Sequence, residues 1–127
     1  MKLKTLFTIT AVFFLIYSAI AILIPEIQLS LYGVVESAGA NYMAQWAGLG
    51  SLVVSLIAWF ARKFDNSNTQ RQIIFLLMIY FILAVGISMV GILKGIMNDI
   101  GWSLAIICLF FAIGYFYYYL KKPTAKE

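Results

Sequence analysis

Four long apolar runs, separated by shorter polar segments, dominate the chain. They cover residues 5–24, 42–61, 73–93 and 101–120, and none of them contains a charged residue. Each is about 20 residues long, which at a helical rise of about 1.5 Å per residue spans the roughly 30 Å hydrocarbon layer of a membrane. Strands of a membrane barrel are only about ten residues long and alternate between apolar and polar positions. The pattern therefore predicts a single all-α domain over residues 1–127, built as a four-helix antiparallel transmembrane bundle.

The composition indicates a protein embedded in lipid. Hydrophobic residues make up 64% of the chain and charged residues 11%, whereas soluble domains average roughly 45–50% and about 25%. Too few polar residues are present to coat a soluble domain of this size. We therefore expect the lipid bilayer to cover much of the surface.

The distribution of Lys and Arg predicts the orientation. Loops rich in these residues stay in the cytoplasm, and here they cluster in the N-terminal segment, the second loop and the C-terminal tail. Only Lys94 lies elsewhere, between the third and fourth runs. The sequence thus predicts a multi-pass protein of the cell inner (plasma) membrane with both termini cytoplasmic. The clustered residues are Lys2, Lys4, Arg62, Lys63, Arg71, Lys121, Lys122 and Lys126.

The first run has an alternative interpretation. Lys2 and Lys4, followed by an apolar stretch and Ala19-Ile20-Ala21, are also typical of a signal peptide with a cleavage site. The apolar stretch continues to Ile24 and is longer than a usual signal core. Cleavage would leave three helices and an N-terminus outside, so we retain the first run as a transmembrane helix.

The three connections differ in character. Segment 25–41 is too apolar for a free loop, and we expect it to lie in the outer membrane interface or to fold back over the bundle. Segment 62–72 is polar, which predicts a solvated hairpin, and segment 94–100 is short. Both lengths favour helices that run antiparallel to their neighbours.

One face of the second run carries most polar candidates. At 100° per residue, Asn41, Gln45, Ser51 and Ser55 fall on one side together with Gly48. Small residues let helices approach closely, and hydroxyls or amides bond across the contact, so the pattern favours packing. The alternative is a polar pocket or path that opens to the outside. Gln45 keeps that alternative open, because an amide inside the membrane costs free energy unless it has a partner.

Other small or polar residues are weaker candidates. Gly91 and Gly95 form a small-xxx-small pair near the end of the third run, which predicts a helix contact within the chain or between copies. Glu26 and Glu36 are the carboxylates of the first loop, and paired carboxylates can perform acid–base work or bind cations. Ten residues of loop separate the two, so their spacing supports no site. Cys108 lies mid-membrane and is expected to be an inert packing residue.

The residue types that many chemistries require are missing. The chain has no histidine and one cysteine, which removes histidine-based zinc and haem sites, the Ser-His-Asp triad and an intramolecular disulfide. We therefore predict no catalytic residue, metal site or cofactor. A proton- or ion-driven transporter usually needs an acidic or basic residue inside the membrane, and the four runs contain none. The basic residues flank membrane segments, so no nucleic-acid partner is expected.

Several short segments resemble a known group of proteins. Together they resemble uncharacterised small bacterial four-helix integral membrane proteins that are loosely similar to the DoxX-like families. The resemblance spans nearly the whole chain and implies the four-helix fold, but it implies no catalytic residues. Such families often carry Arg where Gln45 stands here. The segments are Leu31-Tyr32-Gly33 after Pro25, Met43-Ala44-Gln45-Trp46-Ala47-Gly48-Leu49-Gly50, Trp59-Phe60-Ala61-Arg62 and Ile100-Gly101-Trp102-Ser103.

Three hypotheses for function follow. The first is a non-enzymatic membrane protein that acts through helix–helix association, as an accessory subunit of a membrane-protein partner or as a homo-oligomer. The second is a small channel or carrier for a small or lipophilic molecule, which uses the polar face of the second run. The third is a lipid- or quinone-linked membrane enzyme with Glu26 and Glu36 in its site. We rank the enzyme hypothesis last, because the chain lacks the residue types that most catalytic sites require.

Overall fold

The computed structural model describes residues 2–64 and 66–121, and within them the chain is helical with no strand. Apart from the short α2, the helices are long and apolar enough to cross a membrane. The predicted all-α fold with four helices of membrane-spanning length is therefore confirmed. The helices are α1 (Leu3–Leu23), α2 (Pro25–Leu31), α3 (Ala38–Ala61), α4 (Ser67–Leu93) and α5 (Gly101–Leu120).

Polar caps extend two helices beyond the apolar runs that predicted them. The Ser37 hydroxyl accepts a hydrogen bond from a backbone N–H in the first turn of α3 (3.0 Å), and α3 begins at Ala38 instead of residue 42. The Asn66 side chain accepts from two backbone N–H groups, and α4 begins at Ser67 instead of residue 73. Ser and Asn stabilise helix starts by satisfying such donors. Much of the segment predicted as a polar hairpin is therefore the first turns of α4.

Gly95 ends α4 and does not belong to a helix face. It has a φ of +74°, a left-handed conformation that glycine adopts without strain, and it follows Leu93 and the C-cap residue Lys94. A Cβ at Gly95 would meet no atom within 4 Å, whereas one at Gly91 would lie 3.1 Å from the Met97 sulfur. Gly91 and Gly95 therefore do not share a helix face, and Gly95 makes no close contact with the other described residues, while a contact between copies stays a prediction.

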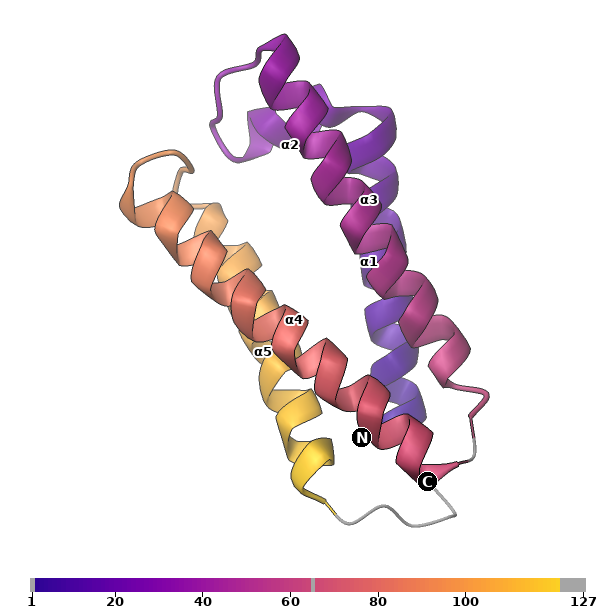
Figure 1. The fold of residues 1–127 in the computed structure, drawn as a ribbon. Coiled ribbons are helices and arrows are strands. Elements are labelled where there is room, and N and C mark those ends of the chain that lie inside the picture. The colour runs from indigo at the N-terminus through magenta and orange to yellow at the C-terminus, as the bar shows by residue number, and fades with distance from the viewer. Residues whose placement is uncertain (1, 65, 122–127) are drawn as a thin grey trace.

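The four long helices associate as two pairs (Figure 1). α1 packs along α3 and α4 packs along α5, whereas contacts between the pairs are far fewer. In the first pair, Ser55 Oγ donates to the Ala11 carbonyl (2.6 Å) and Gln45 Nε2 donates to the Ile22 carbonyl (3.1 Å). Such bonds join helices in lipid, where hydrophobic attraction between them is weak.

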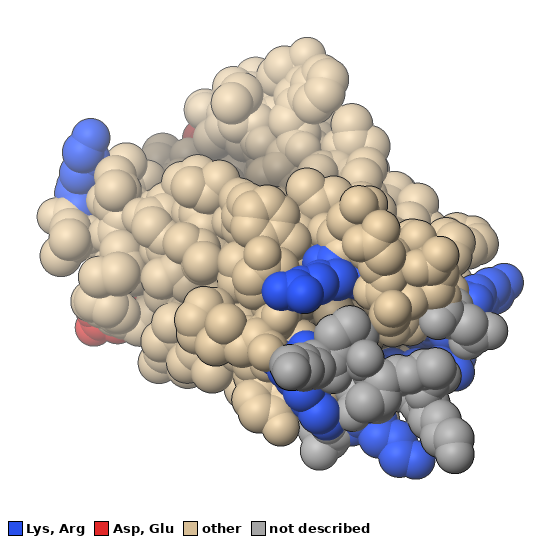
Figure 2. All heavy atoms as spheres, turned by 60° about the horizontal axis from the view of Figure 1, so that its bottom comes forward, with Lys and Arg blue, Asp and Glu red and all other residues tan. Residues whose placement is uncertain are grey.

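Basic residues gather at the end of the molecule where α1 begins and α5 ends (Figure 2). There Lys4 lies beside Arg62 and Lys63, and the Arg71 guanidinium lies over the Tyr119 ring at 5.0 Å. Lys94 lies at the opposite end, in the α4–α5 connection. The described carboxylates Glu26, Glu36 and Asp99 also belong to that opposite end, while Lys122 and Lys126 lie outside the described residues.

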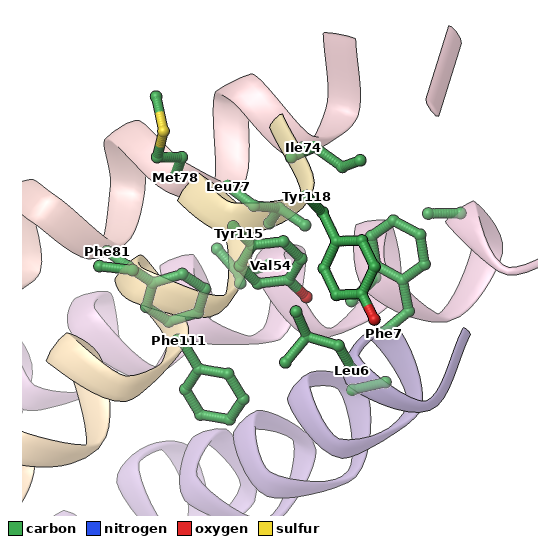
Figure 3. Packing of buried hydrophobic residues seen from close by; sticks show 14 of the residues in the cluster. Leu6, Phe7, Val54, Ile74, Leu77, Met78, Phe81, Phe111, Tyr115 and Tyr118 are labelled. Atoms are coloured by element: carbon green, nitrogen blue, oxygen red, sulfur yellow. The ribbon is translucent and has the colours of Figure 1, made fainter. Parts of the chain in front are cut away.

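An aromatic core joins the two pairs toward the basic end (Figure 3). The rings of Phe81 and Tyr115 stack with centroids 5.8 Å apart and planes 5° apart, and Phe14 packs against Phe81 at 5.3 Å. The hydroxyls of Thr10 and Tyr115 hydrogen bond at 2.6 Å, which ties α1 to α5. Dispersion between these closely packed rings stabilises the contact, because each buried ring makes many such contacts.

Loop contacts join the pairs at the opposite end. α2 packs against α3 and α1. Asn98, in the α4–α5 connection, donates from its backbone N–H to the Tyr32 carbonyl (2.8 Å) and from Nδ2 to the Leu31 carbonyl (3.1 Å). Gly33 has a φ of +69°, and a Cβ there would lie 3.0 Å from Asn98 Nδ2, so glycine permits this close approach. The aromatic core thus joins the two pairs from the basic end to the middle of the helices, and loop contacts join them again at the opposite end.

Candidate functional site

A cavity of about 430 Å³ separates the two helix pairs on the far side of the aromatic core from the basic end. Its volume falls in the roughly 300–1,000 Å³ range of small-molecule sites. Every long helix contributes to its wall. The lining residues are Phe14 and Tyr17 of α1, Ala47, Gly50 and Ser51 of α3, Tyr80, Leu83, Ala84, Ile87 and Ser88 of α4, and Leu104 and Cys108 of α5.

Tyr80 and Ser51 place a pair of hydroxyl groups in the cavity wall. The two side chains interact electrostatically with each other, and Ser51 Oγ donates its proton to the Ala47 carbonyl (3.1 Å). A tyrosine hydroxyl can both donate and accept a hydrogen bond, so Tyr80 offers either to a ligand in the cavity.

Tyr17 links the cavity to the loop that follows α2. Its side chain interacts electrostatically with that of Tyr32, the residue that follows α2. Burial raises the pKa of the Tyr32 phenol above its ordinary value, so Tyr32 is neutral at physiological pH. Asn98 also donates to the Tyr32 carbonyl, so α1, the loop after α2 and the α4–α5 connection are linked at the end of the molecule opposite the basic residues.

The cavity opens sideways between α3 and α4. These two helices contact each other little, and the exposed residues Ala47, Gly50, Leu83 and Ile87 form the rim. Leu83 is 60% exposed and Ile87 73% exposed. A Cβ at Gly50 would meet no atom within 4 Å, so the mouth is unobstructed there. Because both helices are of membrane-spanning length, this opening faces lipid.

The chemistry of the lining is that of an uncharged site. No Asp, Glu, Lys or Arg is among the lining residues, and within residues 2–64 and 66–121 no cluster of three His, Cys, Asp or Glu is suited to hold a metal ion. A charged ligand would lose its hydration without gaining an opposite charge. The arrangement suits a mostly apolar molecule that carries a hydroxyl or carbonyl group.

The polar residues predicted as a binding face lie in different places. Ser51 lines the cavity. Asn41 Nδ2 donates to the Glu36 carboxylate at 3.3 Å, at the start of α3 and outside the cavity. Glu26 is exposed in the first turn of α2. The structure therefore brings Asn41 and Glu36 together but joins neither of them to Ser51.

Gln45, Ser55 and Gly48 face α1. The two polar side chains bond to α1 carbonyls, as described above. Ser55 is buried and Gln45 is exposed on a helix of membrane-spanning length, so each bond satisfies a polar group that is costly without a partner in lipid. A Cβ at Gly48 would lie 2.7 Å from the Ala21 Cβ, so this glycine lies at a very close approach of the two helices. These contacts match the packing interpretation of the second run.

Sequence reasoning missed most of the polar cavity wall. Tyr17, Tyr80 and Ser88 were not considered as site residues, and Cys108, expected to be an inert packing residue, is buried and lines the cavity. The sequence could have indicated the two tyrosines, because they lie within apolar runs and away from the membrane interfaces where tyrosine is usual. Gln28 of α2 is another missed residue: it is 7% exposed, and its Oε1 has no hydrogen-bond partner.

Comparison with known proteins adds no assignment to this site. No protein-family model, curated protein or solved structure matches the chain. The cavity, its lining and the charge distribution therefore carry the functional interpretation.

Proposed function

We propose that this chain is a multi-pass protein of the inner (plasma) membrane that binds or carries an uncharged lipophilic molecule in the cavity between its helix pairs. The observation that carries the proposal is the cavity itself: hydroxyl-bearing side chains line it, and its mouth faces lipid. The apolar body of such a molecule packs against Phe14 and Leu104. Its hydroxyl or carbonyl group bonds to the hydroxyls of Tyr80 or Ser88.

The proposal includes an antiparallel bundle with both termini in the cytoplasm. Gln45, early in α3, bonds to Ile22, late in α1. Phe75, early in α4, packs against Tyr119, late in α5, at 5.5 Å. Both pairings support antiparallel neighbours. The clustering of Lys and Arg at one end supports a cytoplasmic location for that end, so the cavity lies in the middle and outer part of the membrane.

The other two hypotheses have less support. The hypothesis of association with another protein rested on small residues such as Gly48 and Gly91. Both glycines pack within the chain, Gly48 against Ala21 and Gly91 against Met97. The carboxylates in the enzyme hypothesis lie in α2 and the following loop, outside the cavity. A binding or carrier role accounts for the cavity, which neither of the other two hypotheses requires.

Photolabelling of the reconstituted protein tests the proposal. The full chain in phosphatidylcholine nanodiscs is irradiated with a diazirine-bearing long-chain alcohol, and mass spectrometry locates the labelled residues. We expect saturable labelling on the cavity wall, in particular at the buried residues Ser88 and Cys108. Labelling confined to lipid-facing positions, rising linearly with probe concentration, would contradict the proposal.

A pair of glycine substitutions, one at the cavity mouth and one away from it, tests whether the probe binds in the cavity. Gly50→Leu places a side chain in the mouth, and overpacking of about 1–3 kcal/mol corresponds to a roughly five- to 150-fold loss of probe affinity. Gly86→Leu is the matched control, because Gly86 also has no atom within 4 Å of its Cβ position but does not line the cavity. Equal saturable labelling of the two variants would remove the cavity as the binding site.

A further inference from the structure

Three cationic side chains converge at the basic end of the groove between α1 and α3. Lys4, Arg62 and Lys63 line one depression of about 460 Å³. The carboxylates of residues 2–64 and 66–121 all lie at the opposite end of the molecule, and Asp65, two residues after Lys63, lies outside the described residues. The three converging cations favour an anion in the depression. Its remaining lining residues are Thr5, Thr8 and Trp59.

Aromatic and hydroxyl groups shape this depression. The Arg62 guanidinium lies over the Trp59 indole, 4.1 Å from the ring centroid, and this cation–π contact holds it at the end of α3. Thr8 Oγ1 donates to the Lys4 carbonyl at 2.8 Å. Thr5 also lines the depression, and a threonine hydroxyl can donate a hydrogen bond to an anion. This donor set suits a phosphate group, which accepts several charge-assisted hydrogen bonds.

An apolar groove continues from the depression toward the middle of the membrane. Its volume is about 240 Å³, and Trp59 belongs to both. Ser55 lies in its wall but donates its proton to the Ala11 carbonyl, so it has no proton left to donate there. The depression and the apolar groove together follow α1 from Lys4 to Leu15. At about 1.5 Å per residue this distance is about 16 Å, which is long enough for most of an acyl chain. The other lining residues are Val12 and Leu56.

We propose that the α1–α3 groove binds one anionic phospholipid of the leaflet at the basic end. Lys4, Arg62 and Lys63 bind its phosphate, and one acyl chain lies along Val12 and Leu15. Basic pockets between membrane helices bind anionic headgroups in this way. A zwitterionic lipid brings its own cation, and a free phosphate ion brings no chain, so the two features together select an anionic phospholipid. No lining residue is shared with the central cavity, and this site does not depend on the proposed function.

Native mass spectrometry tests the headgroup part of the site. The full chain is released from nanodiscs of mixed phosphatidylglycerol and phosphatidylcholine, and the retained lipid is identified. We expect the wild type to prefer phosphatidylglycerol, and Arg62→Gln combined with Lys63→Gln to reduce that preference by about 30-fold, from roughly 1 kcal/mol for each charge. Arg71→Gln is the matched control, because Arg71 lies at the same end but lines a different depression, and it should leave the preference unchanged. Equal retention of the two lipids by the wild type would overturn the proposal.

A second pair of variants separates a bound lipid from a bound phosphate ion. Val12→Trp fills the acyl groove without a change of charge, and Val53→Trp is its control, since the two valines are 48% and 49% exposed and Val53 lies outside the groove. We expect Val12→Trp alone to lower phosphatidylglycerol retention, while both variants keep the melting temperature of the wild type. If the two variants retain phosphatidylglycerol equally and inorganic phosphate displaces it, the site binds a phosphate ion and the lipid proposal is wrong.

Discussion

Replacing Gly48 with alanine is expected to push α1 and α3 apart. The new Cβ would lie 2.7 Å from the Ala21 Cβ and 3.0 Å from Ile22 Cγ1, whereas carbon atoms pack at about 3.5–4.0 Å. The Ala21 methyl cannot rotate away, so relief requires the helices to separate by about 1 Å near this point. Overpacking of this kind costs about 1–3 kcal/mol. The separation would also stretch the bonds that Gln45 and Ser55 make to α1.

A neighbouring glycine isolates the steric part of this cost. Alanine is the better helix former by about 1 kcal/mol, which offsets part of the clash at Gly48. Gly50→Ala makes the same change two residues along α3, where a Cβ would meet no atom within 4 Å. The difference in free energy of unfolding between the two variants should therefore equal the steric cost, about 1–3 kcal/mol.

Reversible unfolding in mixed micelles, followed by tryptophan fluorescence as the fraction of SDS rises, measures this difference. Ala21→Gly removes the opposing methyl but itself costs about 1 kcal/mol of helix propensity, so the contact is measured by a double-mutant cycle. Gly48→Ala should destabilise the Ala21→Gly background less than it destabilises the wild type, and the cost that remains is due to Ile22. If Gly48→Ala and Gly50→Ala unfold with the same free energy, the close approach of α1 and α3 is wrong. Equal effects of Gly48→Ala in the two backgrounds would refute the contact with Ala21.

Two further predictions concern the aromatic core, and the same unfolding assay measures both. Tyr115→Phe removes the 2.6 Å hydrogen bond to Thr10. It should lower the free energy of unfolding by about 0.6 kcal/mol, and by at most about 1.7 kcal/mol, as measured for hydrogen bonds between membrane helices. A double-mutant cycle with Thr10→Val that shows no coupling would contradict this. Phe81→Ala opens a cavity at a fully buried ring that stacks on Tyr115 and should cost about 3–5 kcal/mol. Phe110→Ala, at a 50% exposed position of α5, should cost far less, and a similar loss in both variants would argue against the core.

Only part of the candidate site was predictable from sequence. Helical periodicity placed Ser51 on the polar side of the second run, and Ser51 lines the cavity. The same periodicity grouped it with Gln45, which faces α1 instead. A helix face of about 120° can touch two neighbours at once, and the periodicity of one helix does not say which neighbour each residue meets. Tyr17 and Tyr80 come from different helices, so their presence in one cavity wall depends on how the pairs are arranged.

The sequence by itself determined that the chain has four helices of membrane-spanning length, because the free energy of placing backbone and side chains in lipid accumulates residue by residue along each run. It also predicts the orientation, through Lys and Arg in the connections. Tertiary structure alone decided the association of α1 with α3 and of α4 with α5, the cavity between the pairs, and the end of α4 at Gly95. In lipid every apolar side chain is equally well solvated on either side of its helix. Shape and hydrogen bonding between distant segments, as in the contacts of Gly48 with Ala21 and of Ser55 with Ala11, therefore decide which faces meet.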